Sequence, residues 1–133
     1  MAETLSRRNG RFLTTLKSED LPGHWIRLLK PLRYRSASGL TFVVPASFIC
    51  DMTSSWLKRR GDHDVAAVLH DWLYFHGAMG RAEADALYFE AMRALEVPLH
   101  RAYCFYLAVR LGGWRAWEKH RARDRRNDDL LAS

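Results

Sequence analysis

The sequence of 133 residues has little of what marks secreted, membrane-spanning or disulfide-stabilised proteins. Its two cysteines, Cys50 and Cys104, are too few and too far apart for a disulfide framework or a cysteine-based zinc site, so we expect free thiols. No apolar run is long enough to cross a bilayer, and the first residues lack the apolar core of a signal peptide. We therefore expect a protein that is made in a cytoplasm and stays soluble.

Acidic residues are fewer than basic ones, 15 against 21, which gives a net charge of +6. The charge is unevenly spread: residues 1–60 carry +7, residues 61–100 carry −5 and residues 101–133 carry +4. An acidic middle segment suits a site that holds a cation, and basic flanks suit a protein surface that meets an anionic partner. A chance distribution of surface charge accounts for the same pattern equally well.

The order of the hydrophobic patterns predicts an α+β fold, because strand patterns come first and helical patterns follow. We expect a small antiparallel β region in the N-terminal half, packed against a three-helix C-terminal half. The expected extended segments are 24–30, 32–35, 40–44 and 47–51, and the expected helices run from Asp62 or Asp64 to about His76, from Arg81 to Leu95 and from Pro98 to about Lys119.

A single domain is expected over residues 21–120. Residues 1–20 are polar with scattered apolar positions and are predicted to be a flexible lead-in. Residues 121–133 form a charged tail that we expect to fray. The glycine pair at 112–113 lies inside the third predicted helix and should weaken or kink it.

The most informative motif is a His-Asp pair on the first predicted helix, followed by an Asp on the second. The turn between these helices centres near residue 78, so His70 precedes it by about as many residues as Asp85 follows it. In an antiparallel helix hairpin these two positions lie opposite each other, which predicts a His70–Asp85 hydrogen bond. Tyr74 is one helical turn from His70 and can join the network. A histidine oriented by a carboxylate is typical of a general base.

Asp71 points elsewhere, because one residue along a helix rotates a side chain by about 100°. Its expected partner is Asp51, at the end of the last extended segment, together with carbonyl groups of the loop at 51–54. Carboxylate and carbonyl oxygens favour calcium or magnesium over zinc. The alternative is that His70, Asp71, Tyr74 and Asp85 form a buried polar network that only fixes the helix hairpin.

The string His-Asp-x-x-Tyr followed by Arg-x-x-Ala-Asp-x-x-x-Phe resembles the active-site helices of phospholipase A2, in particular the short bacterial and fungal type. The resemblance implies that His70 activates water, that Asp85 orients it, that Asp71 and Asp51 bind calcium, and that Tyr74 supports the site. The sequence departs from that family in lacking disulfides near the motif and a glycine-rich calcium loop, and its preceding strands are not part of that fold.

A second resemblance extends over roughly residues 25–117. It rests on Pro-Leu-Arg-Tyr-Arg at 31–35, Phe-Val-Val-Pro-Ala-Ser-Phe at 42–48, Asp-x-Thr-Ser at 51–54, Ala-Val-Leu-His-Asp-x-Leu-Tyr at 67–74, Arg-x-x-Ala-Asp at 81–85 and Gly-Gly-Trp at 112–114. Together these segments resemble the phage and prophage family of domain of unknown function 1353. The resemblance implies a small protein of tailed bacteriophages, made in the bacterial host cytoplasm, and it implies no established activity.

Two functions from different classes follow. The first is a calcium-dependent, phospholipase A2-like ester hydrolase that acts on host envelope lipid. The alternative is a non-enzymatic module for virion or tail assembly, which binds other phage structural proteins and whose His-Asp network is structural.

The third predicted helix is aromatic and basic, so it could lie on an anionic membrane or, as the least favoured alternative, bind nucleic acid. We expect instead that its aromatic side chains pack on the strands and that its arginines face water.

Overall fold

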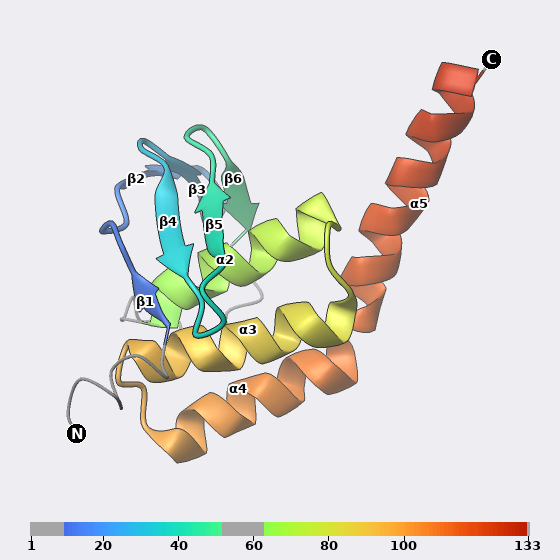
Figure 1. Ribbon diagram of the computed structural model, residues 1–133. Coiled ribbons are helices and arrows are strands. Elements are labelled where there is room, and N and C mark those ends of the chain that lie inside the picture. Colours follow the sequence, from blue (N-terminus) through green and yellow to red (C-terminus); the bar gives the residue numbers. More distant parts are fainter. Residues whose placement is uncertain (1–9, 52–62, 133) are drawn as a thin grey trace.

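The computed structural model describes residues 10–51 and 63–132. Within these residues six short strands precede four helices, so the predicted α+β class and the order of strands and helices are confirmed (Figure 1). The elements are β1 (Arg11–Phe12), β2 (Ser18–Leu21), β3 (Trp25–Leu28), β4 (Leu32–Arg35), β5 (Thr41–Val44), β6 (Ile49–Asp51), α2 (His63–His76), α3 (Arg81–Ala94), α4 (Leu99–Gly112) and α5 (Trp114–Ala132).

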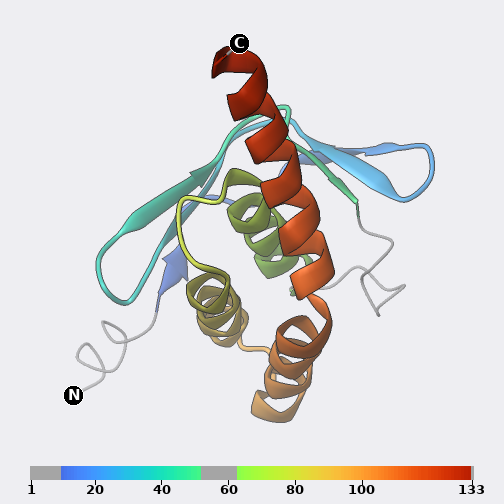
Figure 2. The ribbon, with the colours of Figure 1, turned by 90° about the vertical axis from the view of Figure 1, so that its right-hand side faces the viewer.

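The strands form two antiparallel sheets of three, in the orders β1-β4-β5 and β2-β3-β6. Figure 2 shows the two sheets diverging on either side of α2. The predicted hairpin of β4 and β5 is present, and Gly39 closes its turn with a φ of 91°, a left-handed conformation that glycine adopts without strain. On β4 the apolar Leu32 and Tyr34 are buried whereas the two arginines beside them are exposed, which is the alternation expected of a half-buried strand.

The hydrophobic core lies between the inner faces of the sheets and helices α2 and α3. Helix α2 ends where Gly77 adopts a φ of 72°, and its amide donates to the carbonyl of Leu73 at 3.1 Å. Helix α3 lies between α2 and α4 (Figure 1). The largest side chains that are fully enclosed are Leu28, Leu32, Tyr34, Val44, Cys50, Val68, Leu69, Asp85 and Met92.

The single third helix that we expected at 98–119 is instead two helices, α4 and α5, which meet at Gly113. A Cβ atom at Gly113 would lie 2.5 Å from the carbonyl oxygen of Val109 and 2.6 Å from the hydroxyl of Tyr74. Only a residue without a side chain allows the chain to pass this close to α2, so the glycine ends α4 where sequence analysis placed a kink.

Two further predictions differ from the structure. The predicted flexible lead-in, residues 1–20, contains strand β1 and most of strand β2, which pair with β4 and β3. Residues 121–132 continue α5 instead of fraying. The arginines at the start of this stretch bind the C-terminal end of α2: Arg121 donates to the carbonyl of Tyr74 at 2.7 Å and Arg123 to that of Phe75 at 2.9 Å. Guanidinium groups stabilise a helix when they bind the last carbonyls at its C-terminus, which have no partner within the helix.

Helix α4 packs against α3 rather than against the strands, so the expectation that its aromatic side chains lie on the strands is wrong. Phe105 and, on α5, Trp117 do pack against the core, whereas Tyr103 and Trp114 are exposed. No helix within the described ranges combines the length and the apolar character needed to cross a membrane.

Glu90 on α3 connects the helices to the first sheet. Its Oε1 accepts a 2.6 Å hydrogen bond from the hydroxyl of the fully buried Tyr34 and a 2.9 Å bond from the amide of Ala37. We expect Glu90→Ala to lower the free energy of unfolding by about 2 kcal/mol, because the buried hydroxyl loses its acceptor, and Tyr34→Phe to lower it by only about 1 kcal/mol. Urea unfolding measures both. Glu83→Ala, at an exposed position of the same helix, is the control, and equal loss in Glu83→Ala and Glu90→Ala would contradict the role of Glu90.

Candidate functional site

Asp85 is the centre of the polar network between the helices. Its carboxylate has no solvent exposure and accepts hydrogen bonds from three side chains. Oδ1 is 2.7 Å from Nε2 of His70 and 2.6 Å from the hydroxyl of Tyr74, both on α2, and Oδ2 is 2.8 Å from a guanidinium nitrogen of Arg110 on α4. The predicted His70–Asp85 hydrogen bond and the participation of Tyr74 are therefore present.

These bonds determine which nitrogen of His70 carries a proton. Burial alone would raise the pKa of Asp85, but the hydrogen bonds from His70, Tyr74 and Arg110 outweigh it and hold the pKa below its usual value. Asp85 is therefore an ionised acceptor, and Nε2 of His70 must be the donor. In neutral His70 the lone pair then lies on Nδ1, the atom that could accept a proton from water.

The ring of His70 is held from several sides. Its centroid is 4.3 Å from that of Tyr74 and 4.6 Å from that of Tyr88, and 6% of the residue is exposed. Gly113 approaches Tyr74 from the α4–α5 junction. The ring therefore has little freedom to rotate away from Asp85, which suits either a positioned base or a structural hydrogen bond.

Two arginines that were not among the predicted site residues also bind Asp85. Arg81 on α3 lies 3.5 Å from Oδ2 and also donates to the carbonyls of Val109 and Arg110 at the end of α4. Its position four residues before Asp85 on one helix is a signal that could have found it. Arg110 carries no such signal, because only the packing of α4 on α3 brings its side chain to Asp85.

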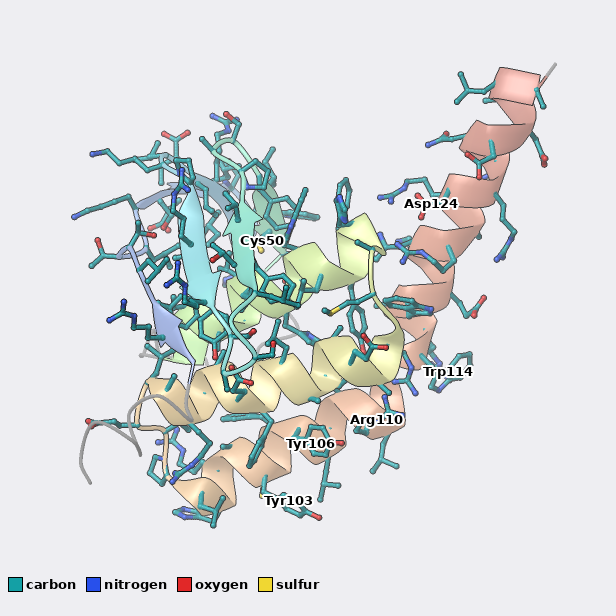
Figure 3. The ribbon with its side chains drawn as sticks, viewed as in Figure 1. Cys50, Tyr103, Tyr106, Arg110, Trp114 and Asp124 are labelled. Carbon is teal, nitrogen blue, oxygen red and sulfur yellow. The ribbon has the colours of Figure 1, made fainter. Side chains whose placement is uncertain are left out.

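Asp71 lies on a different face of α2, as predicted, and faces β6. The thiol of Cys50 donates to its Oδ2 at 3.5 Å (Cys50 is labelled in Figure 3, where the sheet meets α2). Burial raises the pKa of Asp71 to about 6; the charge of Asp51 adds to this rise, whereas His70 and the Cys50 thiol oppose it. The structure thus brings Asp51 and Asp71 close enough for their charges to interact.

The described residues fit part of a hard-cation site. Asp51 and Asp71 supply two carboxylates, and a divalent cation between them would offset the burial and repulsion that raise the pKa of Asp71. Burial also raises the pKa of Cys50, so it stays a thiol and is a poor ligand for zinc. No group of three or more His, Cys, Asp or Glu suited to a metal occurs within 10–51 and 63–132. The carbonyl ligands predicted at 52–54 lie outside the described residues.

Replacing the central carboxylate should destabilise the fold. We expect Asp85→Asn to lower the free energy of unfolding at neutral pH by about 3 kcal/mol. The reason is that Arg110 and Arg81 lose the buried, negatively charged carboxylate that both of them bind. The folded pKa of Asp85 is depressed, so its contribution is complete above the unfolded value of about 4 and is lost as pH falls below it. Urea unfolding of wild type and variant across this range should therefore show a gap that narrows in acid.

Asp128→Asn, at an exposed position near the end of α5, is the matched control. It should leave both the stability and its pH dependence unchanged. A pH-independent gap between wild type and Asp85→Asn would contradict the ionised state of Asp85.

Comparison with known proteins identifies the chain at the level of its family. No curated protein and no solved structure shows a significant match to it. The family model described as "Protein of unknown function (DUF1353)" matches residues 26–109, which is more than half of the chain and includes His70, Asp71, Tyr74 and Asp85. The chain therefore belongs to the DUF1353 family.

Proposed function

We propose that the protein is a cation-dependent ester hydrolase of the phospholipase A2 kind, with His70 as its general base. The observation that carries the proposal is the hydrogen bond between Nε2 of His70 and the ionised Asp85, because it directs the lone pair of neutral His70 to Nδ1. The carboxylate of Asp71, the next residue on α2, supports the proposal because it can serve as a ligand for the cation. The same relation of base, orienting carboxylate and cation ligand is implied by the sequence resemblance to phospholipase A2.

In the proposed reaction, Nδ1 of His70 takes a proton from water as the water oxygen attacks the ester carbonyl carbon. The bond between that carbon and the alkoxide oxygen then breaks, and the proton on Nδ1 passes to the leaving alkoxide, which yields a fatty acid and an alcohol. Asp85 keeps the ring oriented and stabilises its protonated form, and the Tyr74 hydroxyl fixes the carboxylate. The Tyr74 role is positional, since its hydroxyl bonds Asp85 rather than the ring.

Asp51 and Asp71 would hold the cation, for which calcium is the proposed identity. When bound, it supplies polarisation of the ester carbonyl and stabilisation of the oxyanion. Asp71 follows the base directly in sequence, so the rigid backbone of α2 fixes the position of its carboxylate relative to His70.

The proposed substrate is phospholipid of a bacterial envelope, and the proposed origin is a bacteriophage. Both rest on the sequence resemblances and on the basic flanks of the chain, which would favour approach to an anionic lipid surface. We expect the protein to be made in the host cytoplasm.

The activity test is fatty-acid release from vesicles that contain phosphatidylglycerol, with calcium or with EDTA. We expect release with calcium only, and we expect His70→Gln to lower its rate by about 10²-fold or more, since the side chain that accepts the proton is gone. His76→Gln, at an exposed position of the same helix, should retain the wild-type rate. A full rate in folded His70→Gln would overturn the assignment of the base.

Cation binding can be measured without activity. We expect calcium to raise the melting temperature of the wild type and to leave that of Asp71→Asn unchanged, because a ligand that binds only the folded state stabilises it. Magnesium tests selectivity, and Glu83→Gln is the control for a nonspecific effect of charge. An equal calcium shift in Asp71→Asn and wild type would exclude Asp71 as a ligand.

A second candidate function is a non-enzymatic phage virion or tail assembly module. The observation in its favour is enclosure: Asp85 has no exposure, 6% of His70 is exposed, and two arginines share the carboxylate with the histidine. In this case the network only holds the helices together. His70→Gln would then lower stability, and the wild type would release no fatty acid under any cation condition.

A further inference from the structure

Helix α4 carries a row of large exposed apolar side chains. The exposed fractions are 59% for Leu99, 52% for Tyr103, 40% for Leu107 and 79% for Leu111, and the row continues to Trp114 at the start of α5, which is 50% exposed. Isolated exposed apolar residues are common on protein surfaces, but a continuous group of them marks a surface that binds something. We refer to these five residues as the α4 row.

The α4 row faces away from the rest of the molecule. Its first four members are spaced four residues apart and so lie along one side of the helix, whereas Ala102, Phe105 and Val109 pack toward the core from the other side. In Figure 1, α4 lies on the side of α3 that faces away from the sheets, and in Figure 3 Tyr103 extends outward from α4. The row is therefore the outer surface of the helical layer.

The charges within the segment that carries the row have one sign. Residues 97–117 contain no Asp or Glu. Arg101 and Arg115 are exposed, and the Arg115 guanidinium lies 5.4 Å from the centroid of the Trp114 ring. Arg110 binds Asp85 instead of facing this surface freely. A second copy of this face would bring like charges together, so charge complementarity favours an anionic occupant.

We propose that the α4 row docks the protein onto an anionic phospholipid bilayer. Leucines at this surface would enter the boundary between headgroups and acyl chains, and Tyr103 and Trp114 have the amphipathic rings that prefer this depth. Arg101 and Arg115, at the two ends of the row, would lie level with the lipid phosphates. A nucleic acid would use the arginines and leave the leucines exposed, and so fits this surface less well.

The docking surface does not depend on the proposed hydrolase activity. His70 is on α2 and the row is on α4, with α3 between them. Bilayer binding should therefore persist in EDTA and in His70→Gln. Loss of catalysis with retained docking, or the reverse, separates the two proposals.

The experiment is sedimentation of the protein with vesicles of phosphatidylcholine alone or mixed with phosphatidylglycerol, in EDTA. We expect binding to the mixed vesicles that weakens as salt rises. The double variant Leu107→Gln/Leu111→Gln should bind roughly tenfold or more weakly, because two side chains no longer favour the acyl region. The matched control is Leu130→Gln/Leu131→Gln, which makes the same change at two exposed leucines at the far end of α5 and should bind as the wild type does.

Further measurements keep the result interpretable. Each variant is checked for wild-type melting, which is expected because the replaced side chains are exposed. Vesicles should shift the tryptophan emission of the wild type to shorter wavelength, and Trp114→Phe should reduce that shift. The proposal is overturned if folded row and control variants bind equally, if the mixed vesicles bind nothing, if the row variant instead converts a dimer to a monomer, or if it weakens binding to DNA rather than to lipid.

Discussion

The helical half of this protein depends on one buried charge. The Asp85 carboxylate has lost all contact with water, and an ionised carboxylate in such a place is stable only if donors replace the lost hydration. His70 and Tyr74 supply two of these donors from α2, and Arg110 supplies another from α4, while Arg81 lies beside it on α3. Because the donors come from three helices, a single side chain links all three of them.

The same network determines how Asp85 orients the ring of His70. A carboxylate that also binds two guanidinium groups has its Oδ2 occupied by them, which leaves Oδ1 to the imidazole and to the Tyr74 hydroxyl. It is a well-fixed acceptor, and a fixed acceptor determines the tautomer. The arrangement therefore orients the histidine ring through its Nε2. A base needs that orientation, and so does a structural hydrogen bond, which is why both proposed functions use the same contacts.

The parts that sequence could predict are those that depend on local spacing. The His70–Asp85 bond follows from counting residues on both sides of one turn, and the separation of Asp71 from His70 follows from the pitch of a helix. Arg110 could not be found this way, because its role exists only once α4 is placed against α3. The glycine pair at 112–113 predicted a weak point in the helix, but the close approach of Gly113 to Tyr74 depends on how the helices pack. The strands at 11–12 and 18–21 were missed for a related reason: they are short and polar, and pairing with β4 and β3 makes them strands.

Helix α4 connects the buried charge with the outer surface. An apolar helix that has no acidic residue and few charges normally lies in a core, covered on all sides. Here α3 covers one side, and the bond from Arg110 to Asp85, together with the bonds from Arg81 to the last carbonyls of α4, fixes which side that is. The rotation of α4 about its own axis is therefore not free: Ala102, Phe105 and Val109 face the core, and the apolar row on the other side is left exposed. The proposed lipid-binding surface thus follows from how α4 packs on α3, and the bond from Arg110 to Asp85 is part of that packing.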